Sequence, residues 1–205
     1  MTNEIIVTKR DGKKEPLDLE KMHKVVFYAC EGISGVSASE VELKSHIQFF
    51  NGISTSEVQE TLIKAASDLI TEETPNYQWV AGRLINYHLR KMVYNQFNPP
   101  HLSEIARTNV ELGYYDPEFF VSYDEEEIDQ LNSYLKHDRD EDLAYAGMEQ
   151  FRGKYLVQNR VSGKVYETPQ VCYMMISATL FSHYEKNVRM KYVKDFYDLR
   201  LDPYF

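Results

Sequence analysis

Cysteine is scarce in this sequence. Only Cys30 and Cys172 occur among the 205 residues, and neither belongs to a CxxC pair. Two isolated thiols provide neither a disulfide framework nor the ligand set of a structural zinc site. We therefore expect both cysteines to be reduced, unreactive residues of a core.

Long hydrophobic runs are absent as well. No stretch approaches the roughly 18 consecutive apolar residues of a membrane-spanning helix. The N-terminal residues Met1 to Glu4 lack the basic and apolar regions of a signal peptide. These features predict a cytoplasmic protein without membrane partners.

The sequence also lacks an excess of positive charge. Its formal net charge is -9, which disfavours a duplex DNA or RNA partner because phosphate neutralisation requires a basic surface. Hydrophobic residues make up 43% of the chain, enough for a folded core. A few local cations can still hold a small phosphate ligand.

Phosphate-binding loops of the common kinds are missing. Neither GxxxxGK[ST] nor GxGxxG occurs, so a nucleotide site here is neither a P-loop nor a Rossmann crevice. No nucleophile and base stand out as a pair. We expect nucleotide binding without hydrolysis, no catalytic residues, no metal site built by the protein and no catalytic cofactor.

The sequence pattern of residues 1–95 predicts a small β-hairpin followed by four helices. Short strands near residues 5–7 and 15–17 flank the turn signal Asp11–Gly12. Helix starts are marked by N-cap residues, capping boxes and a first-turn proline at Asp18, Ser37–Glu40, Ser54–Glu57 and Thr74–Pro75. The second helix is expected to reach about residue 50, and the fourth about residue 96.

The dipeptide Pro99–Pro100 marks the expected boundary between a first domain, residues 1–95, and a second, residues 96–205. The second domain is predicted to be helical as well, with a short hairpin around Ser162–Gly163. Helices are expected at residues 101–112, after Asp124, and at 143–155, 168–184 and 186–199. The predicted fold class is therefore mainly α.

Four places in the first domain are candidates for binding phosphate. Lys9–Arg10 puts two cations beside a tight turn, which suits a polyphosphate. Residues 15–21 lead from a strand into a helix N-terminus, which attracts anions. Thr55 offers a hydroxyl, and Lys91 can lay its stem along apolar surface with its charge at a cleft. The alternatives are a solvated turn for Lys9–Arg10 and ordinary helix capping for Asp18 and Thr55.

The segments Val7–Gly12, Glu15–Lys21 and Tyr77–Lys91 resemble the ATP-cone, a hairpin and four-helix domain that binds ATP or dATP. The resemblance implies ATP or dATP as allosteric effector, with Mg²⁺. Gln59 departs from the family, whose cones often carry a histidine there. The resemblance implies nucleotide contacts at Lys9, Arg10, Glu15, Pro16, Leu17, Asp18, Leu19, Glu20, Lys21, Thr55 and Lys91.

The second domain resembles the region between cone and catalytic barrel in class I ribonucleotide reductase large subunits of bacteria and phages. The segments that carry this resemblance are Phe97–Pro100, His137–Asp140, Gly153–Arg160, Thr168–Tyr184 and Tyr192–Asp198. It implies a component of an oxidoreductase that makes deoxyribonucleotides for DNA replication. In this family the helical region packs on an α/β barrel.

The resemblance also implies partners. Cys30 and Cys172 do not match the family's catalytic cysteines, and Leu201–Phe205 stands where the family leads into the barrel. We therefore expect the barrel on a second large-subunit polypeptide, together with a small radical-generating subunit and a large-subunit dimer. The location would be the host cytoplasm if a phage encodes the chain. A stand-alone nucleotide-binding regulatory module and an inactive truncated fragment are the alternatives.

Overall fold

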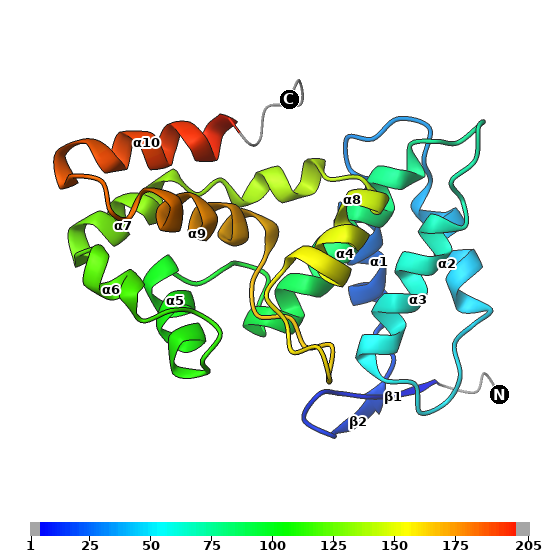
Figure 1. Cartoon of the computed structure of the whole chain (residues 1–205). Coiled ribbons are helices and arrows are strands. Elements are labelled where there is room, and N and C mark those ends of the chain that lie inside the picture. The colour runs from blue at the N-terminus through cyan, green and yellow to red at the C-terminus, as the bar shows by residue number, and fades with distance from the viewer. Residues whose placement is uncertain (1–4, 200–205) are drawn as a thin grey trace. The chain divides into compact units, whose positions relative to one another are not determined.

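The computed structural model describes residues 5–199; the terminal segments Met1–Glu4 and Arg200–Phe205, and with them the predicted entry to the barrel at Leu201–Phe205, lie outside the described residues. The described part is mainly helical, with one two-stranded hairpin at its start (Figure 1). Both features confirm the fold class that the sequence predicts.

The hairpin pairs β1 (Ile6–Thr8) with β2 (Lys14–Pro16) in antiparallel register, with Val7 opposite Glu15. A 3₁₀ helix spans His137–Asp142 and a π-helix spans Phe151–Tyr155. The α-helices are α1 (Leu19–Cys30), α2 (Ala38–His46), α3 (Thr55–Ser67), α4 (Tyr77–Tyr94), α5 (Leu102–Glu111), α6 (Glu118–Ser122), α7 (Glu125–Tyr134), α8 (Tyr145–Gln150), α9 (Pro169–Phe181) and α10 (Lys186–Leu199).

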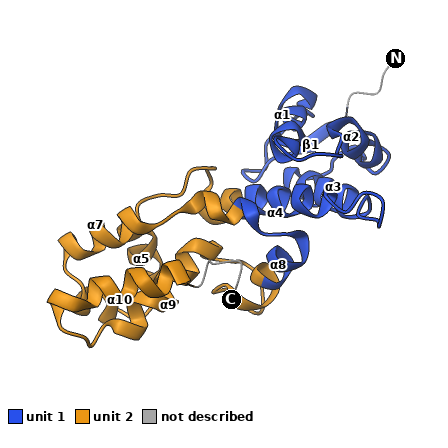
Figure 2. Cartoon of the chain, turned by 90° about the horizontal axis from the view of Figure 1, so that it is seen from above, with its two compact units in different colours: residues 1–89, 141–150 blue, residues 90–140, 151–205 orange. Residues whose placement is uncertain are grey.

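The chain divides into two compact units (Figure 2). Unit 1 comprises residues 1–89 and 141–150, and unit 2 comprises residues 90–140 and 151–205. The division therefore falls within α4, and the short segment that contains α8 returns to unit 1. Unit 1 holds the hairpin and helices α1 to α3, which are the elements that carry most of the predicted nucleotide contacts.

Several helices begin at the capping residues that the sequence predicts. The Asp18 carboxylate accepts the N–H of Lys21 at 2.9 Å and caps α1. Ser54 and Glu57 form the predicted capping box of α3, with the hydroxyl and the carboxylate each accepting the other residue's N–H. Such reciprocal bonds satisfy N–H groups that lack a partner within the helix.

The capping box predicted at Ser37–Glu40 is wrong. The Ser37 side chain makes no capping bond. Instead, the backbone N–H of Ser37 donates to the Tyr77 hydroxyl at 2.9 Å, and that hydroxyl donates to the Glu40 carboxylate. Tyr77 is fully buried, and a buried phenol needs hydrogen-bond partners. It takes up the two groups that would otherwise have capped each other.

Helix α2 ends at His46, earlier than predicted, because the residues after it bind the hairpin. The side-chain oxygen of Asn51 accepts the N–H of Ile6 at 3.0 Å. The N–H of Gly52 donates to the Ile6 carbonyl at 2.7 Å. Residues near 50 therefore pair with β1 and are not available to continue a helix.

Three other helix boundaries differ from the prediction. α4 begins at Tyr77, because the Thr74 hydroxyl donates to the Leu69 carbonyl at 2.7 Å and holds the preceding turn. The helix expected over 143–155 changes after Gln150 into a π-helix, where the N–H of Leu156 reaches five residues back to Phe151 at 3.0 Å. α9 ends at Phe181, before the predicted residue 184.

Both cysteines are free thiols, as expected. Burial raises the pKa of Cys30 to about 11, and it also raises the pKa of the buried Cys172. A thiol with a raised pKa has little reactive thiolate near neutral pH. These pKa directions agree with the interpretation of two unreactive thiols.

His137 makes the stability of unit 2 sensitive to acid. Burial and the Arg90 guanidinium lower the pKa of His137 to about 4, against a weaker opposing effect of Asp138. The folded state therefore binds fewer protons than the unfolded state between about pH 6.5 and 4. The free energy of unfolding consequently decreases as the pH is lowered across that range. His137→Asn should reduce this loss by about 2–3 kcal/mol between pH 7.5 and 4.5.

Urea unfolding of both proteins at the two pH values measures this difference. Glu167 has the opposite effect on the pH dependence of stability, because burial raises the pKa of its carboxyl and acid then favours the folded state. The comparison is therefore made between wild type and variant, in which the Glu167 contribution cancels. An equal acid loss in both proteins would contradict the assignment to His137.

Candidate nucleotide-binding site

The tip of the hairpin carries the first two candidate cations. The N–H of Lys9 donates to the Lys13 carbonyl at 2.8 Å, and the N–H of Gly12 donates to the Lys9 carbonyl at 2.9 Å. Gly12 has a φ of +83°, which suits glycine in a tight turn. This closed turn holds the backbone at Lys9 and Arg10 in a defined conformation.

Lys9 is held across the hairpin by Glu15. Its ammonium lies 2.8 Å from the Glu15 carboxylate, and both side chains are about two-fifths exposed, at 41% and 42%. The hydrogen bond to Glu15 raises the pKa of Lys9, so the ammonium stays charged. The structure thus brings together two residues that the sequence predicts in one site.

Arg10 and Tyr87 of α4 interact electrostatically. Burial lowers the pKa of Arg10 and the tyrosine opposes that effect, while burial raises the pKa of Tyr87 and the arginine opposes it. No local sequence signal links a hairpin residue to Tyr87, and sequence reasoning did not include this tyrosine in the site.

The hairpin is tied to the N-terminus of α3, where Thr55 lies. The N–H of Thr8 donates to the Ile53 carbonyl at 2.9 Å, and Thr8 forms a parallel bridge with Ser54. Behind this contact, Val7, Ile53 and Val58 form a small buried cluster. The first turn of α3, with Thr55, therefore starts directly beside the strand that leads to Lys9.

The predicted segment 15–21 contains residues in different surroundings. The Asp18 carboxylate is already engaged with the N–H of Lys21. Glu20 faces solvent, where it pairs with Lys24 at 2.8 Å, one helical turn later. Pro16 and Lys21 are exposed, and Leu17 packs against the Val7 cluster. Among the described contacts, only Glu15 of this segment pairs directly with a candidate cation.

Gln59 lies one helical turn after Thr55 in α3, on the same side of the helix. Its side-chain oxygen is buried and has no hydrogen-bond partner in the described part of the chain. The next residue, Glu60, lies 3.4 Å from the buried His88 ring of α4.

Lys91 follows Tyr87 by four residues in α4, which puts the two side chains on one face of that helix.

Comparison with known proteins identifies both parts of the chain. Residues 5–92 match the ATP cone domain, a range that includes every predicted nucleotide contact. Residues 141–205 match the ribonucleotide reductase all-alpha domain. Over 198 residues the chain is 50% identical to ribonucleoside-diphosphate reductase 1 subunit alpha of Salmonella typhimurium and of Escherichia coli K12. The chain is therefore similar, over nearly its whole length, to the N-terminal region of ribonucleotide reductase alpha subunits.

A phage protein is similar to the chain as well. Over 197 residues the chain is 39% identical to the alpha subunit of Enterobacteria phage T4. The alignment covers 97% of the chain for the Salmonella and Escherichia proteins and 95% for the T4 protein, but only 26% of each of these relatives. The chain therefore corresponds to about a quarter of a reductase alpha subunit, its N-terminal region.

Proposed function

We propose that this chain binds ATP or dATP in its cone as the allosteric effector of a ribonucleoside-diphosphate reductase. The match of residues 5–92 to the ATP cone domain carries this proposal. The structure supports it through the hairpin, where Lys9 and Arg10 sit on a closed turn beside the start of α3. Cations on a rigid turn can hold phosphates with little loss of conformational entropy on binding.

In this proposal Lys9 and Arg10 bind the phosphates, and Lys91 adds a third positive charge. Phosphate oxygens would replace Glu15 as the partner of Lys9 or share the ammonium with it. Thr55 donates its hydroxyl to the nucleotide. The second carboxylate oxygen of Asp18 accepts from a ribose hydroxyl or the adenine amino group, and the remaining residues of 15–21 line the site through their backbone.

Mg²⁺ would enter this site with the phosphates. In the described residues no group of three or more His, Cys, Asp or Glu side chains could hold a metal ion. The oxygen ligands that Mg²⁺ prefers would then come mostly from the nucleotide and from water, with Glu15 the nearest acidic side chain to Lys9.

At the level of the enzyme, we propose that the chain contributes effector control to the reduction of ribonucleoside diphosphates. The catalytic barrel belongs to the part of the alpha subunit that the chain does not span, and a small radical-generating subunit and a second alpha subunit complete the assembly. The described residues contain no helix long and apolar enough to cross a membrane. We propose a cytoplasmic location, as expected of nucleotide metabolism.

Calorimetric titration of the chain with ATP tests the effector site. Lys9→Ala and Lys91→Ala should each weaken ATP binding by about 1–3 kcal/mol, or roughly 5- to 150-fold, through loss of a charged hydrogen bond. Lys64→Ala is the matched control, because Lys64 pairs with Asp68 on the surface of α3 and should leave affinity unchanged. Unchanged affinity in both test variants would remove these lysines from the site, and no ATP binding by the wild type would refute the proposal.

A further inference from the structure

Residues 141–150, which we call the strap, leave unit 2 and return to it but pack within unit 1. Figure 2 shows this segment, with α8, in the colour of unit 1. Helices other than α-helices flank it: the 3₁₀ helix His137–Asp142 runs into its start, and the π-helix Phe151–Tyr155 follows its end. Both kinds of helix recur at hinges and functional sites of proteins. Both ends of the strap therefore have a backbone suited to bending.

The strap is held within unit 1 by contacts with α1 and α4. The Tyr28 hydroxyl of α1 donates to the Glu141 carboxylate. Gly82 of α4 lies so close to the strap that an added Cβ would meet the Leu143 carbonyl oxygen at 2.1 Å. Met148 of α8 is fully buried. Because no side chain separates Gly82 from the strap backbone, a displacement of α4 is passed directly to the strap.

The entry of the strap is tied to α4 a second time, by Arg90. Its guanidinium Nη2 donates to the His137 carbonyl and lies 3.9 Å from the Asp140 carboxylate. Arg90 and Asp140 are 4% and 0% exposed. The energy of a buried ion pair depends steeply on its separation, because little water screens it. A small shift of α4 therefore changes how firmly the 3₁₀ helix at the entry is held.

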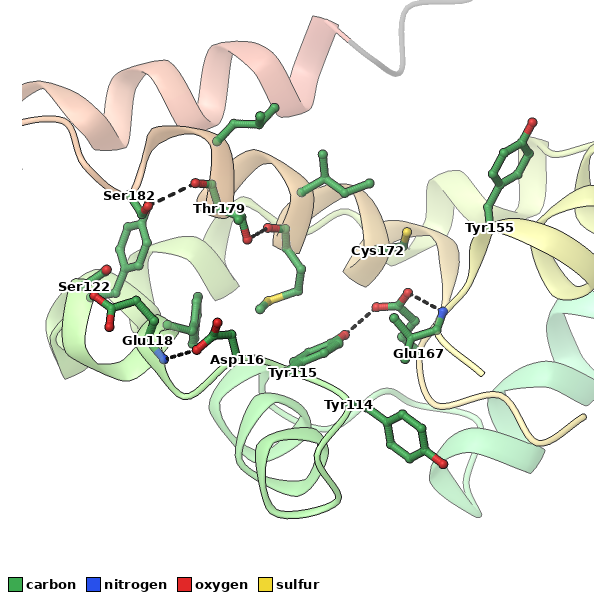
Figure 3. A pocket seen from close by; sticks show the side chains of 16 residues that line it. Tyr114, Tyr115, Asp116, Glu118, Ser122, Tyr155, Glu167, Cys172, Thr179 and Ser182 are labelled. Atoms are coloured by element: carbon green, nitrogen blue, oxygen red, sulfur yellow. Dashed lines mark hydrogen bonds between the residues drawn. The ribbon is translucent and has the colours of Figure 1, made fainter. Parts of the chain in front are cut away.

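The exit of the strap is fixed to the interior of unit 2. The N–H of Val157, two residues after the π-helix, donates to the Glu167 carboxylate at 2.8 Å. Glu167 is 2% exposed and also accepts the Tyr115 hydroxyl. Figure 3 shows Glu167 and Tyr115 at a cavity of unit 2, which Val157 also lines. Since Val157 is anchored in this way, a displacement of the strap must be taken up by the π-helix.

α4 also carries residues of the candidate nucleotide site. Tyr87 and Lys91 lie on one face of this helix, and Arg90 directly precedes Lys91. The stretch from Gly82 to Lys91 covers about 14 Å of a single helix, at a rise of about 1.5 Å per residue. One continuous helix therefore holds a predicted phosphate contact and both contacts to the strap and its entry.

We propose that nucleotide binding in the cone is coupled through α4 to the strap. Phosphate bound at Lys91 fixes α4, and α4 then holds the strap in place through Gly82 and Arg90. The strap in turn restrains the 3₁₀ helix and the π-helix at its two ends. The inference rests on the proposed function, since that function supplies the contact at Lys91. Coupling is reciprocal, so the cone should bind ATP more weakly while the strap is detached.

Hydrogen exchange of the full chain, followed by mass spectrometry with and without saturating ATP, tests the coupling. ATP should slow exchange of the amides of residues 137–155 about threefold or more, because it disfavours detachment of the strap. Exchange in α5, residues 102–111, is the internal control and should not change. Calorimetry on the same sample shows whether ATP is bound.

Tyr28→Phe weakens the strap without touching the nucleotide contacts. It removes the hydroxyl that holds Glu141, so exchange in residues 141–150 without ATP should become about two- to tenfold faster. ATP affinity should stay within about twofold, because the strap remains mostly attached. Tyr134→Phe is the matched control. It removes a hydroxyl that accepts from Gln130 in α7 and should leave exchange in the strap unchanged.

The double variant Arg90→Met with Asp140→Asn tests the link at the strap entry. Both buried charges are removed together, so neither is left unpaired. The variant should still bind ATP, but ATP should slow exchange in residues 137–142 by less than about 1.5-fold. Protection of these residues equal to that of the wild type would exclude Arg90 as the link.

The wild-type measurement decides the proposal even if the double variant does not fold. Unchanged exchange in residues 137–155 of a chain that calorimetry shows to be saturated with ATP would overturn the coupling and leave the effector site standing. Equal slowing in α5 would also overturn it, because ligand binding would then stabilise the whole fold without a specific route. No heat of ATP binding would refute the proposed function itself, and the coupling with it.

Discussion

Replacing Arg189 with methionine is expected to lower the free energy of unfolding by about 3–5 kcal/mol, because it leaves a buried carboxylate without its counter-ion. Glu127 and Arg189 are 3% and 8% exposed. The Arg189 Nε donates to one Glu127 oxygen at 2.7 Å, and Nη2 donates to the other. The guanidinium also lies 4.5 Å from the ring centroid of Tyr123, so the substitution removes a cation–π contact as well.

Urea unfolding followed by far-UV circular dichroism measures this loss. The double variant Glu127→Gln with Arg189→Met should recover a large part of it, because the buried charge is then removed from both sides. Glutamine also keeps an oxygen for the N–H of Asp124, which Glu127 accepts in the capping box of α7. If the double variant were as unstable as Arg189→Met alone, the loss would come from packing and not from the unpaired charge.

Lys194→Met provides the comparison with a surface ion pair. Lys194 bonds Asp198 at 2.5 Å one helical turn along α10, but its side chain is 45% exposed. Exposed pairs at this spacing contribute only about 0.3–0.5 kcal/mol. The tenfold difference expected between the two substitutions therefore tests whether burial decides the energetic role of the Arg189 pair.

Replacing Gly82 with alanine is expected to destabilise unit 1 by about 1–3 kcal/mol, although alanine normally favours a helix. A Cβ atom at this position of α4 would lie 2.1 Å from the backbone carbonyl oxygen of Leu143. A backbone atom cannot turn aside as the end of a flexible side chain can. The segment 141–150 would have to move away from α4, which also threatens the hydrogen bond of Tyr28 to Glu141.

Gly147→Ala is the matched control within the same segment. Gly147 lies in α8, and a Cβ there meets no atom within 4 Å. Alanine should therefore stabilise the protein by about 0.5–1 kcal/mol through its higher helix propensity. Fluorescence of Trp79, the single tryptophan, reports on α4 during urea unfolding. Stabilisation by both substitutions would contradict the close approach of α4 and Leu143.

Much of the candidate site follows from signals a few residues long. The Asp11–Gly12 turn predicts the hairpin, and with it the position of Lys9 and Arg10 at the tip. The Ser54–Glu57 capping box predicts the start of α3 at Thr55. These signals work because turn and capping energies depend on hydrogen bonds between residues two to four positions apart.

The relation between these pieces could not be predicted in that way. Thr8 lies beside Ser54, and Arg10 interacts electrostatically with Tyr87, although the residues of each pair are far apart in the chain. The same is true of Ser37, whose expected capping bond is lost to the buried Tyr77. The family resemblance supplied a set of candidate nucleotide-binding residues. Which of these residues contact one another depends on how the helices and the hairpin pack.

By itself, the sequence determined the mainly helical class, the hairpin, most helix starts and the likeness to a reductase effector domain. Only the tertiary structure decided that Glu15 holds Lys9, that Gly82 must lack a side chain, and that Arg189 neutralises Glu127 from 62 residues away. The physical reason is the range of the interactions. Propensities, turns and caps act between near neighbours, whereas steric fit and the burial of charge depend on which distant segments meet.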